Sequence, residues 1–255
     1  MQICTGKPIA ATLISATIFM LSACNKQAST EVKAVASVVE AAKPKAPPAT
    51  PEDWRKALES SYGTYSVRDE GDGVQSFMAC FEPTPDRKNK CGFVAFGKRD
   101  AFRKLRFYET GIPMRIGSGI STYVSLKDNG SPKLLLAPYI FRDNWIFMNK
   151  VAIMVDGDVI LERDLELTSS DRQVFPGGVQ EDCDFVATED QIHALRKIKP
   201  DSKVLIRITG KKGYMTLTKS DTSTVKSKII EVLRVYDTIL EAVRDKIPPT
   251  VTAAS

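Results

Sequence analysis

A succession of short apolar segments, separated by turn residues, constrains the fold of this chain more than any other feature of its sequence. The segments of its second half follow one another closely: 120–126, 133–141, 145–148, 151–155, 159–167, 183–187, 204–208 and 214–218. Their lengths are typical of β-strands. Asn129-Gly130 accepts positive φ and favours a tight hairpin, and an Asp-Gly-Asp turn occupies 156–158. This pattern predicts an antiparallel, mainly β fold.

Helices are expected at three places. Thr50, followed by a proline and two acids, and Thr188, followed three residues later by Gln191, have the signatures of N-caps. A third helix near the C-terminus has its apolar residues on a single face: Val225, Ile229, Val232, Leu233, Tyr236, Ile239, Leu240 and Val243. Such a stripe has to cover the face of a sheet. We therefore expect a β-sandwich-like fold with a long C-terminal helix and one or two short helices.

The N-terminus has the features of a secretory signal. Lys7 precedes an uncharged apolar stretch at 8–21, which is shorter than the roughly 20 residues that a transmembrane helix needs. The stretch ends in Leu21-Ser22-Ala23-Cys24, and this junction resembles the lipobox of bacterial lipoproteins. The resemblance implies that the Cys24 thiol carries diacylglycerol, with fatty acids such as palmitate, and that cleavage occurs before Cys24. The alternative is an ordinary cleaved signal in which Cys24 is incidental.

The lipobox divides the chain into four parts. We expect a signal peptide at 1–23, a lipid-anchored disordered tether at 24–50, one β-rich periplasmic domain at 51–248 and a tail at 249–255. The tether has no aromatic residue and cannot bury enough apolar surface to offset the entropy of ordering. Asn25 stands where an aspartate would retain a lipoprotein in the inner membrane. The expected location is therefore the outer membrane of a Gram-negative cell, facing the periplasm.

The charge of the chain excludes one class of partner. The formal net charge is +5, and it falls by one when Lys7 leaves with the signal. So mild an excess keeps a periplasmic protein soluble, and it also suits a surface near anionic lipid or glycan. It does not indicate a nucleic-acid-binding protein.

A hairpin with a basic tip is expected between two of the cysteines. Segments 74–81 and 91–96 read as strands around a loop at 82–90, whose prolines and charges cannot continue a β-ladder. Cys80 and Cys91 flank this loop and are the natural disulfide pair in an oxidising compartment.

The other cysteines have different expected fates. Cys4 leaves with the signal, Cys24 carries lipid, and Cys183 is left as a buried thiol or a site of exchange. The chain has no Cys-x-x-Cys pair and a single histidine, so no zinc site is predicted.

Residues 100–110 interleave cations with aromatic residues, as surfaces that bind acidic polymers or proteins do. The segment is ambiguous, because its apolar residues have helical spacing while its neighbours resemble strands. The candidate binding residues combine this segment with the hairpin tip: Arg87, Lys88, Lys90, Arg103, Lys104, Arg106 and Tyr108. The alternative is that the aromatic residues belong to the core and the cations are solvated.

No catalytic constellation stands out. His193 lies within the short second helix, where an exposed position is expected, and the Gly-Ser-Gly at 117–119 lacks the strand-to-helix context of a nucleophile elbow. Glu162, Asp164 and Glu166 alternate along a strand and are either a carboxylate or hard-cation site or a solvated face. We take the solvated face, and we expect no metal, no cofactor and no enzymatic activity.

The folded part of the chain resembles the periplasmic proteins of the invasion-associated locus B family. The likeness rests on the Cys80-to-Cys91 hairpin, on segments 151–157 and 183–187, and on the capped helix, paired strands and helical stripe that follow. It implies a secreted β-sandwich without known catalytic residues and with a role at the cell envelope. The lipobox and tether are not typical of the family, and its paired cysteines near Cys183 are here reduced to one.

Together these features predict a lipid-anchored periplasmic protein that acts by binding, as an accessory or partner-binding lipoprotein. Its expected partners are the outer membrane, through the N-terminal lipid, and a protein in the periplasm. One alternative is an immunity or inhibitor lipoprotein that blocks a toxin enzyme with its basic loop. Another is an enzyme that modifies envelope polymers.

Overall fold

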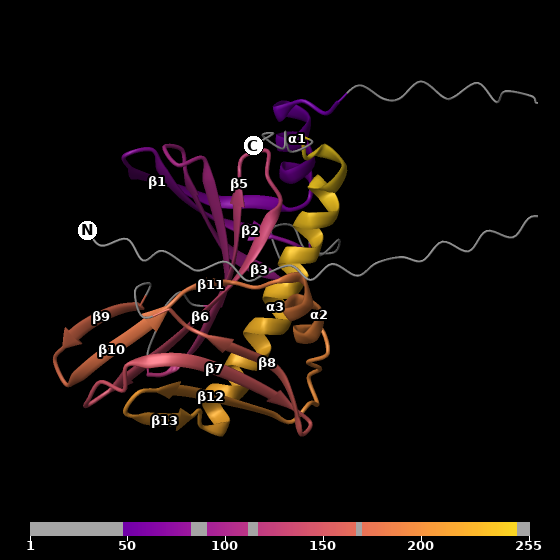
Figure 1. Ribbon diagram of the computed structural model, residues 1–255. Helices are drawn as coiled ribbons and strands as arrows, with labels where there is room; N and C mark the ends of the chain where they lie inside the picture. Colours follow the sequence, from indigo (N-terminus) through magenta and orange to yellow (C-terminus); the bar gives the residue numbers. More distant parts are fainter. Residues whose placement is uncertain (1–47, 83–90, 112–116, 167–169, 249–255) are drawn as a thin grey trace, which may run out of the picture. The chain divides into compact units, whose positions relative to one another are not determined.

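The computed structural model describes residues 48–82, 91–111, 117–166 and 170–248. The chain divides into two units, 1–45 and 46–255, and every described residue belongs to the second. This second unit is mainly β, with antiparallel sheets and one long helix near the C-terminus, so the predicted fold class is confirmed (Figure 1). The predicted signal peptide, Cys24, the tether up to residue 47 and the tail lie outside the described residues.

Strands β1 to β6 form an antiparallel meander that makes up most of the larger sheet. In spatial order its strands are β1 (Gly63–Gly71), β2 (Val74–Cys80), β3 (Val94–Asp100), β4 (Leu105–Thr110), β5 (Gly119–Lys127), β6 (Pro132–Arg142), β10 (Gly178–Cys183) and β9 (Ser170–Phe175). The two-residue β11 (Phe185–Val186) also pairs with β6. Asn129, in the turn between β5 and β6, has a φ of 61°, which confirms the predicted hairpin.

In the described part of the chain, the smaller sheet contains four antiparallel strands. Their spatial order is β13 (Gly213–Thr216), β12 (Val204–Gly210), β7 (Met148–Val155) and β8 (Asp158–Asp164). Asp156 and Gly157 both have positive φ between β7 and β8, and β12 pairs with β13, so both predicted hairpins are confirmed.

Within the described residues, three α-helices accompany the sheets: α1 (Pro51–Ser60), α2 (Glu189–Leu195) and α3 (Lys219–Val243). A short 3-10 turn, η2 (Arg244–Lys246), follows α3. Thr50 and Thr188 cap α1 and α2, as predicted, and both caps have reciprocal side-chain and backbone hydrogen bonds. Hydrogen bonds from Thr50 lower the pKa of the Asp53 carboxyl at the start of α1.

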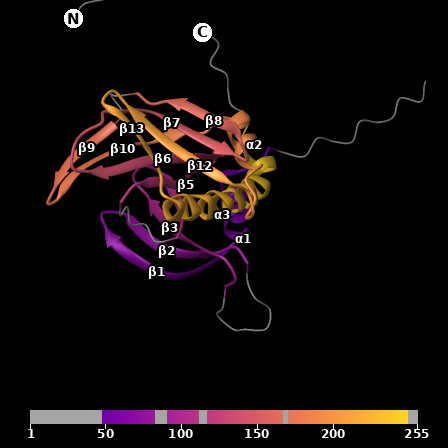
Figure 2. The same ribbon diagram turned by 90° about the horizontal axis from the view of Figure 1, so that it is seen from below.

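Helix α3 connects the two sheets. It contacts β4, β5 and β6 of the larger sheet and β12 of the smaller one, and Figure 2 shows the smaller sheet on one side of the helix and β1–β3 on the other. The hydroxyls of Thr110 and Thr122 both donate to the carbonyl of Lys228, which seats the helix on β4 and β5. The predicted stripe is buried from Val225 to Val243, with Leu240 partly buried, and it belongs to the single described core.

The structure differs from the sequence-based prediction at the edges of the larger sheet. Strand β1 was not predicted, because all of its residues are exposed and it has no alternating apolar pattern. The mostly exposed β9 was missed for the same reason. Residues 101–104 form a turn and 105–110 form β4, so the ambiguity of that segment is resolved as a strand. Residues 145–147 precede β7 and are not part of a strand.

A buried carboxylate holds the connection between β6 and β7. Glu181, on β10, is fully buried, and its two oxygens accept hydrogen bonds of 2.8–3.0 Å from the backbone N–H groups of Ile146, Phe147 and Met148. The Arg172 guanidinium lies 3.6 Å from the same carboxylate. The negative charge of Glu181 thus ties the first strand of the smaller sheet to the larger sheet.

Candidate functional site

Two of the predicted binding residues, Arg106 and Tyr108, lie inside the protein. Their exposed fractions are 4% and 0%, because β4 turns every second residue toward the core. Arg106 forms an ion pair with Asp128 and lies 5.4 Å from the centre of the Trp54 ring. The prediction that these two side chains belong to a contact surface is therefore wrong.

The other predicted binding residues fall into two groups. Arg103 and Lys104 are exposed in the turn between β3 and β4, where Arg103 lies 3.6 Å from the Asp100 carboxylate. They stay candidates for contact with a partner because they are exposed, whereas Arg106 and Tyr108 are buried. Arg87, Lys88 and Lys90 lie outside the described residues, so the role of the basic hairpin tip stays a prediction.

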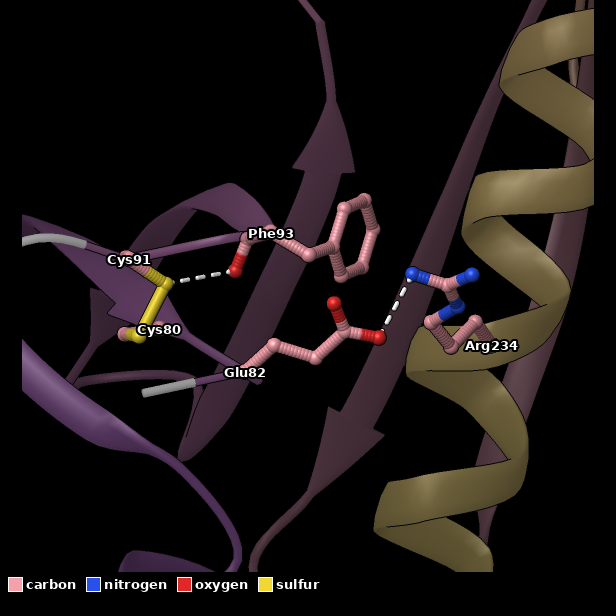
Figure 3. The surroundings of a disulfide bond; sticks show 5 residues. All are labelled: Cys80, Glu82, Cys91, Phe93 and Arg234. Carbon is pink, nitrogen blue, oxygen red and sulfur yellow. Dashed lines mark hydrogen bonds and ion pairs between the residues drawn. A yellow bond between two sulfur atoms is a disulfide. The ribbon is translucent and has the colours of Figure 1, made fainter. Parts of the chain in front are cut away.

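The base of the hairpin is described, and its disulfide is confirmed (Figure 3). Cys80 and Cys91 are bonded, with their Cα atoms 5.7 Å apart, while Cys183 is buried outside this disulfide. Arg234 of α3 donates to the Glu82 carboxylate at 2.8 Å and lies 5.1 Å from the Phe93 ring centre. The disulfide-bonded end of the hairpin is thereby attached to the helix.

The acidic residues of β8 form a solvated face. Glu162 and Asp164 are exposed and lie 2.8 Å and 3.5 Å from the Lys150 ammonium, and this pairing, led by the Glu162 hydrogen bond, raises the Lys150 pKa. Glu166, beyond the end of β8, and His193, on α2, are also exposed. Within the described ranges, no three His, Cys, Asp or Glu side chains are grouped so that they could hold a metal ion.

A groove crosses the open face of the larger sheet, on the side of β1–β5 that faces away from α3. Five apolar side chains that line it, one from each strand, define the aromatic groove: Tyr65, Met78, Phe96, Phe107 and Tyr123. Phe77, which packs against the core, also contributes to the lining. Strand pairing places Tyr65 opposite Met78, and Met78 opposite Phe96, so these side chains share one face. The groove has a volume of about 900 Å³.

Charged groups lie among the apolar side chains of the aromatic groove. Arg68 and Lys98, from β1 and β3, are exposed, and Lys98 is the strand partner of Phe107. Glu109 is the strand partner of both Phe96 and Tyr123, and the Tyr123 hydroxyl donates to Asp184 at 2.5 Å. The groove therefore combines an apolar lining with both cations and acids.

Sequence reasoning missed the aromatic groove because its residues come from five strands. On β2 to β5 the groove side chains alternate with residues that face the core, as Phe107 does with Tyr108, so the sequence suggests that both aromatic residues of such a pair belong to the core. The sequence signal that could have revealed the groove is the alternation of small residues with large apolar or charged residues along a strand. On β3, buried Ala95 and Gly97 alternate with exposed Phe96 and Lys98, and an exposed phenylalanine at such a position needs an explanation.

Comparisons of the chain with protein-family models, with curated proteins and with solved structures found no match. The likeness to the invasion-associated locus B family thus stays a prediction. Among the described helices, none is long and apolar enough to cross a membrane.

Proposed function

We propose that this protein is a lipid-anchored outer-membrane protein, facing the periplasm, that acts by binding a partner in the aromatic groove. The groove itself is the observation that supports this function best. Its apolar side chains lie on the face of β1–β5 that is not packed against α3, so the stability of the core does not require them there. Tyr65 and Phe96 keep 40% and 37% of their surface exposed, which is costly unless something covers them.

The dimensions and composition of the groove fit binding. Ligand sites in proteins are typically ~300–1,000 Å³, mostly apolar, with a few polar groups that orient the ligand. The aromatic groove, at about 900 Å³, has this composition. Its floor consists of hydrogen-bonded strands, so the lining side chains are held in place before a partner arrives.

The proposed anchor would keep this groove near the membrane. Lipid on Cys24 would tether the domain through residues 25–50, which could extend to at most ~85 Å. The domain could then reach partners in the periplasm or at the membrane surface.

Site-specific photo-crosslinking in living cells tests the binding function on the full-length chain. Phe96 is replaced by p-benzoylphenylalanine, and a second strain carries the same amino acid at Val159 on β8, which belongs to the smaller sheet and does not line the groove. Val159 is 55% exposed, more than Phe96, so non-specific capture would favour the control. Adducts are then identified by mass spectrometry of the purified protein.

We expect a discrete adduct at Phe96 and none at Val159. A protein adduct would favour a partner-binding or inhibitor role, and a small-molecule adduct would favour a ligand carrier. If irradiation gives no more product at Phe96 than at Val159, the groove is not a binding site and the proposed function fails.

A further inference from the structure

We propose that the tip of the β9–β10 hairpin inserts into the surface of an anionic lipid membrane. This hairpin tip consists of residues 173–180, which contain no charged side chain. The inference goes beyond binding in the aromatic groove. It takes from the proposed function only the location of the domain beside a membrane.

The hairpin tip exposes apolar side chains that are not part of the described core. Val174 and Phe175 keep 78% and 40% of their surface exposed. Val174 pairs with the half-buried Val179, so the apolar surface continues from one strand of the hairpin to the other. In Figures 1 and 2 the hairpin projects from the edge of the described fold. An exposed apolar patch of this kind marks a contact with a protein or a membrane.

A tight turn holds the hairpin tip in a fixed shape. Pro176 and Gly177 connect Phe175 to Gly178, which are the last pair of the β9–β10 ladder. Proline restricts its own φ, and Gly177 has a φ of 90°, so the two residues suit a type II turn. Because the tip is already ordered, its insertion loses little conformational entropy.

An exposed cation lies beside the hairpin tip. Val179 is the strand partner of both Val174 and Arg142, so the three side chains share one face of the sheet. Phe175 and the turn extend beyond this row by about 3–7 Å, at the rise of a strand. Apolar groups of interfacial proteins enter the head-group region by about 5–10 Å. An inserted tip therefore brings the Arg142 guanidinium to the level of the lipid phosphates.

Two further exposed cations, Lys211 and Lys212, lie in the turn between β12 and β13. This turn is next to β9, because the Lys212 ammonium and the Arg172 guanidinium lie 4.8 Å and 5.6 Å from the centre of the same Phe147 ring. The Lys211 N–H also donates to the Phe147 carbonyl, which fixes the turn beside the connection between β6 and β7. The base of the hairpin thus has cations on its side toward the smaller sheet.

The charges and the size of this surface favour a lipid membrane over a protein. The exposed cations Arg142, Lys211 and Lys212 outnumber Asp143 and Asp171, the exposed acids adjacent in sequence to Arg142 and to β9 residue 172. Cations near a membrane surface are attracted to anionic lipids. A stable protein interface buries about 800 Å² on each partner, and the four exposed residues 174–177 offer much less.

Photo-crosslinking in living cells tests the insertion on the full-length chain. Phe175 is replaced by p-benzoylphenylalanine, which inserts into the C–H bonds of a neighbouring acyl chain. The strain with p-benzoylphenylalanine at Val159 is the control. Val159 is 55% exposed, and strand pairing places it at the other end of the smaller sheet from the β12–β13 turn. The adduct mass distinguishes a phospholipid from a protein.

The role of the cations is tested in the same Phe175 strain. Lys211→Gln and Lys212→Gln together remove two exposed charges beside the hairpin. A matched control carries Lys197→Gln and Lys199→Gln, which remove two exposed charges at the end of α2. All four lysines are exposed, so the substitutions do not disturb the core.

We expect a phospholipid adduct at Phe175 and none at Val159. Its yield should fall about tenfold with Lys211→Gln and Lys212→Gln and stay unchanged in the control. A protein adduct at Phe175, or no more adduct than at Val159, would overturn the insertion. A phospholipid adduct that is insensitive to the loss of Lys211 and Lys212 would overturn the role of the cations. The Phe96 strain reports on the groove separately, so failure at Phe175 leaves the proposed binding function standing.

Discussion

The hydroxyl oxygens of Tyr62 and Tyr108 lie 2.9 Å apart inside the core, although one residue follows α1 and the other lies in β4. Their rings meet edge to face at 5.5 Å, and Phe77 and Phe81 pack around them. The pair therefore joins the first helix to the centre of the larger sheet through one hydrogen bond and a cluster of rings. Burial raises the pKa of both hydroxyls above their ordinary value of 10.0.

The buried tyrosine pair predicts a loss of stability at high pH. Below pH 10 both tyrosines are neutral in the folded and the unfolded chain, so their burial adds no pH dependence. Above pH 10 the unfolded tyrosines ionise while Tyr62 and Tyr108 stay protonated, so the free energy of unfolding falls as the pH rises. Urea unfolding at several values from pH 8 to pH 11 measures this. The Tyr62→Phe, Tyr108→Phe double variant should show a shallower fall, and an equal slope would refute the assignment.

Replacing Glu181 should destabilise the fold. In Glu181→Gln one oxygen remains, but the new NH₂ group faces a backbone N–H that had a carboxylate partner, so we expect a loss of about 2–4 kcal/mol in the free energy of unfolding. The exposed pair of Glu162 with Lys150 supplies a matched control, since Glu162→Gln should lower the free energy of unfolding far less than Glu181→Gln does. Equal effects of the two substitutions in denaturant titrations would show that Glu181 does not hold the β6–β7 connection.

Gly97 is required by the ring of Phe77. A Cβ atom at position 97 would lie 2.1 Å from the Phe77 ring, which itself packs on Tyr62 and Tyr108. Gly97→Ala should therefore lower the free energy of unfolding by about 1–3 kcal/mol. Gly63→Ala is the control, because its Cβ would meet only ordinary contacts at 3.7 Å. Adding Phe77→Leu to Gly97→Ala should recover part of the loss in thermal unfolding. A double variant no more stable than Gly97→Ala would contradict the steric explanation.

Removing the Cys80–Cys91 disulfide should destabilise the protein without unfolding it. The bond closes a short loop, so Cys80→Ser with Cys91→Ser should cost about 2–3 kcal/mol by freeing the unfolded chain. Chemical denaturation measures the loss, and peptide mapping of the non-reduced protein checks the pairing. A main crosslink between Cys183 and either partner would contradict both the disulfide and the geometry of the hairpin base.

The proposed anchor predicts a change of location on substitution of Cys24. Cys24→Ala should either release the protein into the soluble periplasmic fraction or leave an uncleaved precursor, since the thiol is the proposed acylation point. Cys183→Ala, which changes a buried cysteine, should leave the protein with the membranes. If Cys24→Ala partitions into detergent as the wild type does and the N-terminal peptide carries no lipid, the lipoprotein proposal is abandoned.

The amino-acid sequence by itself determined the elements whose signals are local. The N-caps at Thr50 and Thr188 could be predicted because the residues that mark them lie within the next three positions of the chain. The turn at Asn129 could be predicted because asparagine accepts the positive φ that such a turn requires. The buried face of α3 could be predicted because its apolar residues repeat with the period of a helix. Cys80 and Cys91 were paired correctly because the loop between them is short.

Only the tertiary structure decided which residues face outward together. Arg106 and Phe107 are neighbours in the sequence, yet Arg106 pairs with Asp128 inside the protein while Phe107 lines the aromatic groove. The two side chains lie on opposite faces of the sheet because successive residues of a strand point in opposite directions. No local signal in the sequence tells which of the two faces a helix will cover. Tyr65 joins the groove only because the exposed edge strand β1 pairs with β2. The aromatic groove therefore depends on the register between strands that are distant in the sequence. That register is set by packing over the whole core, so no single segment predicts the groove.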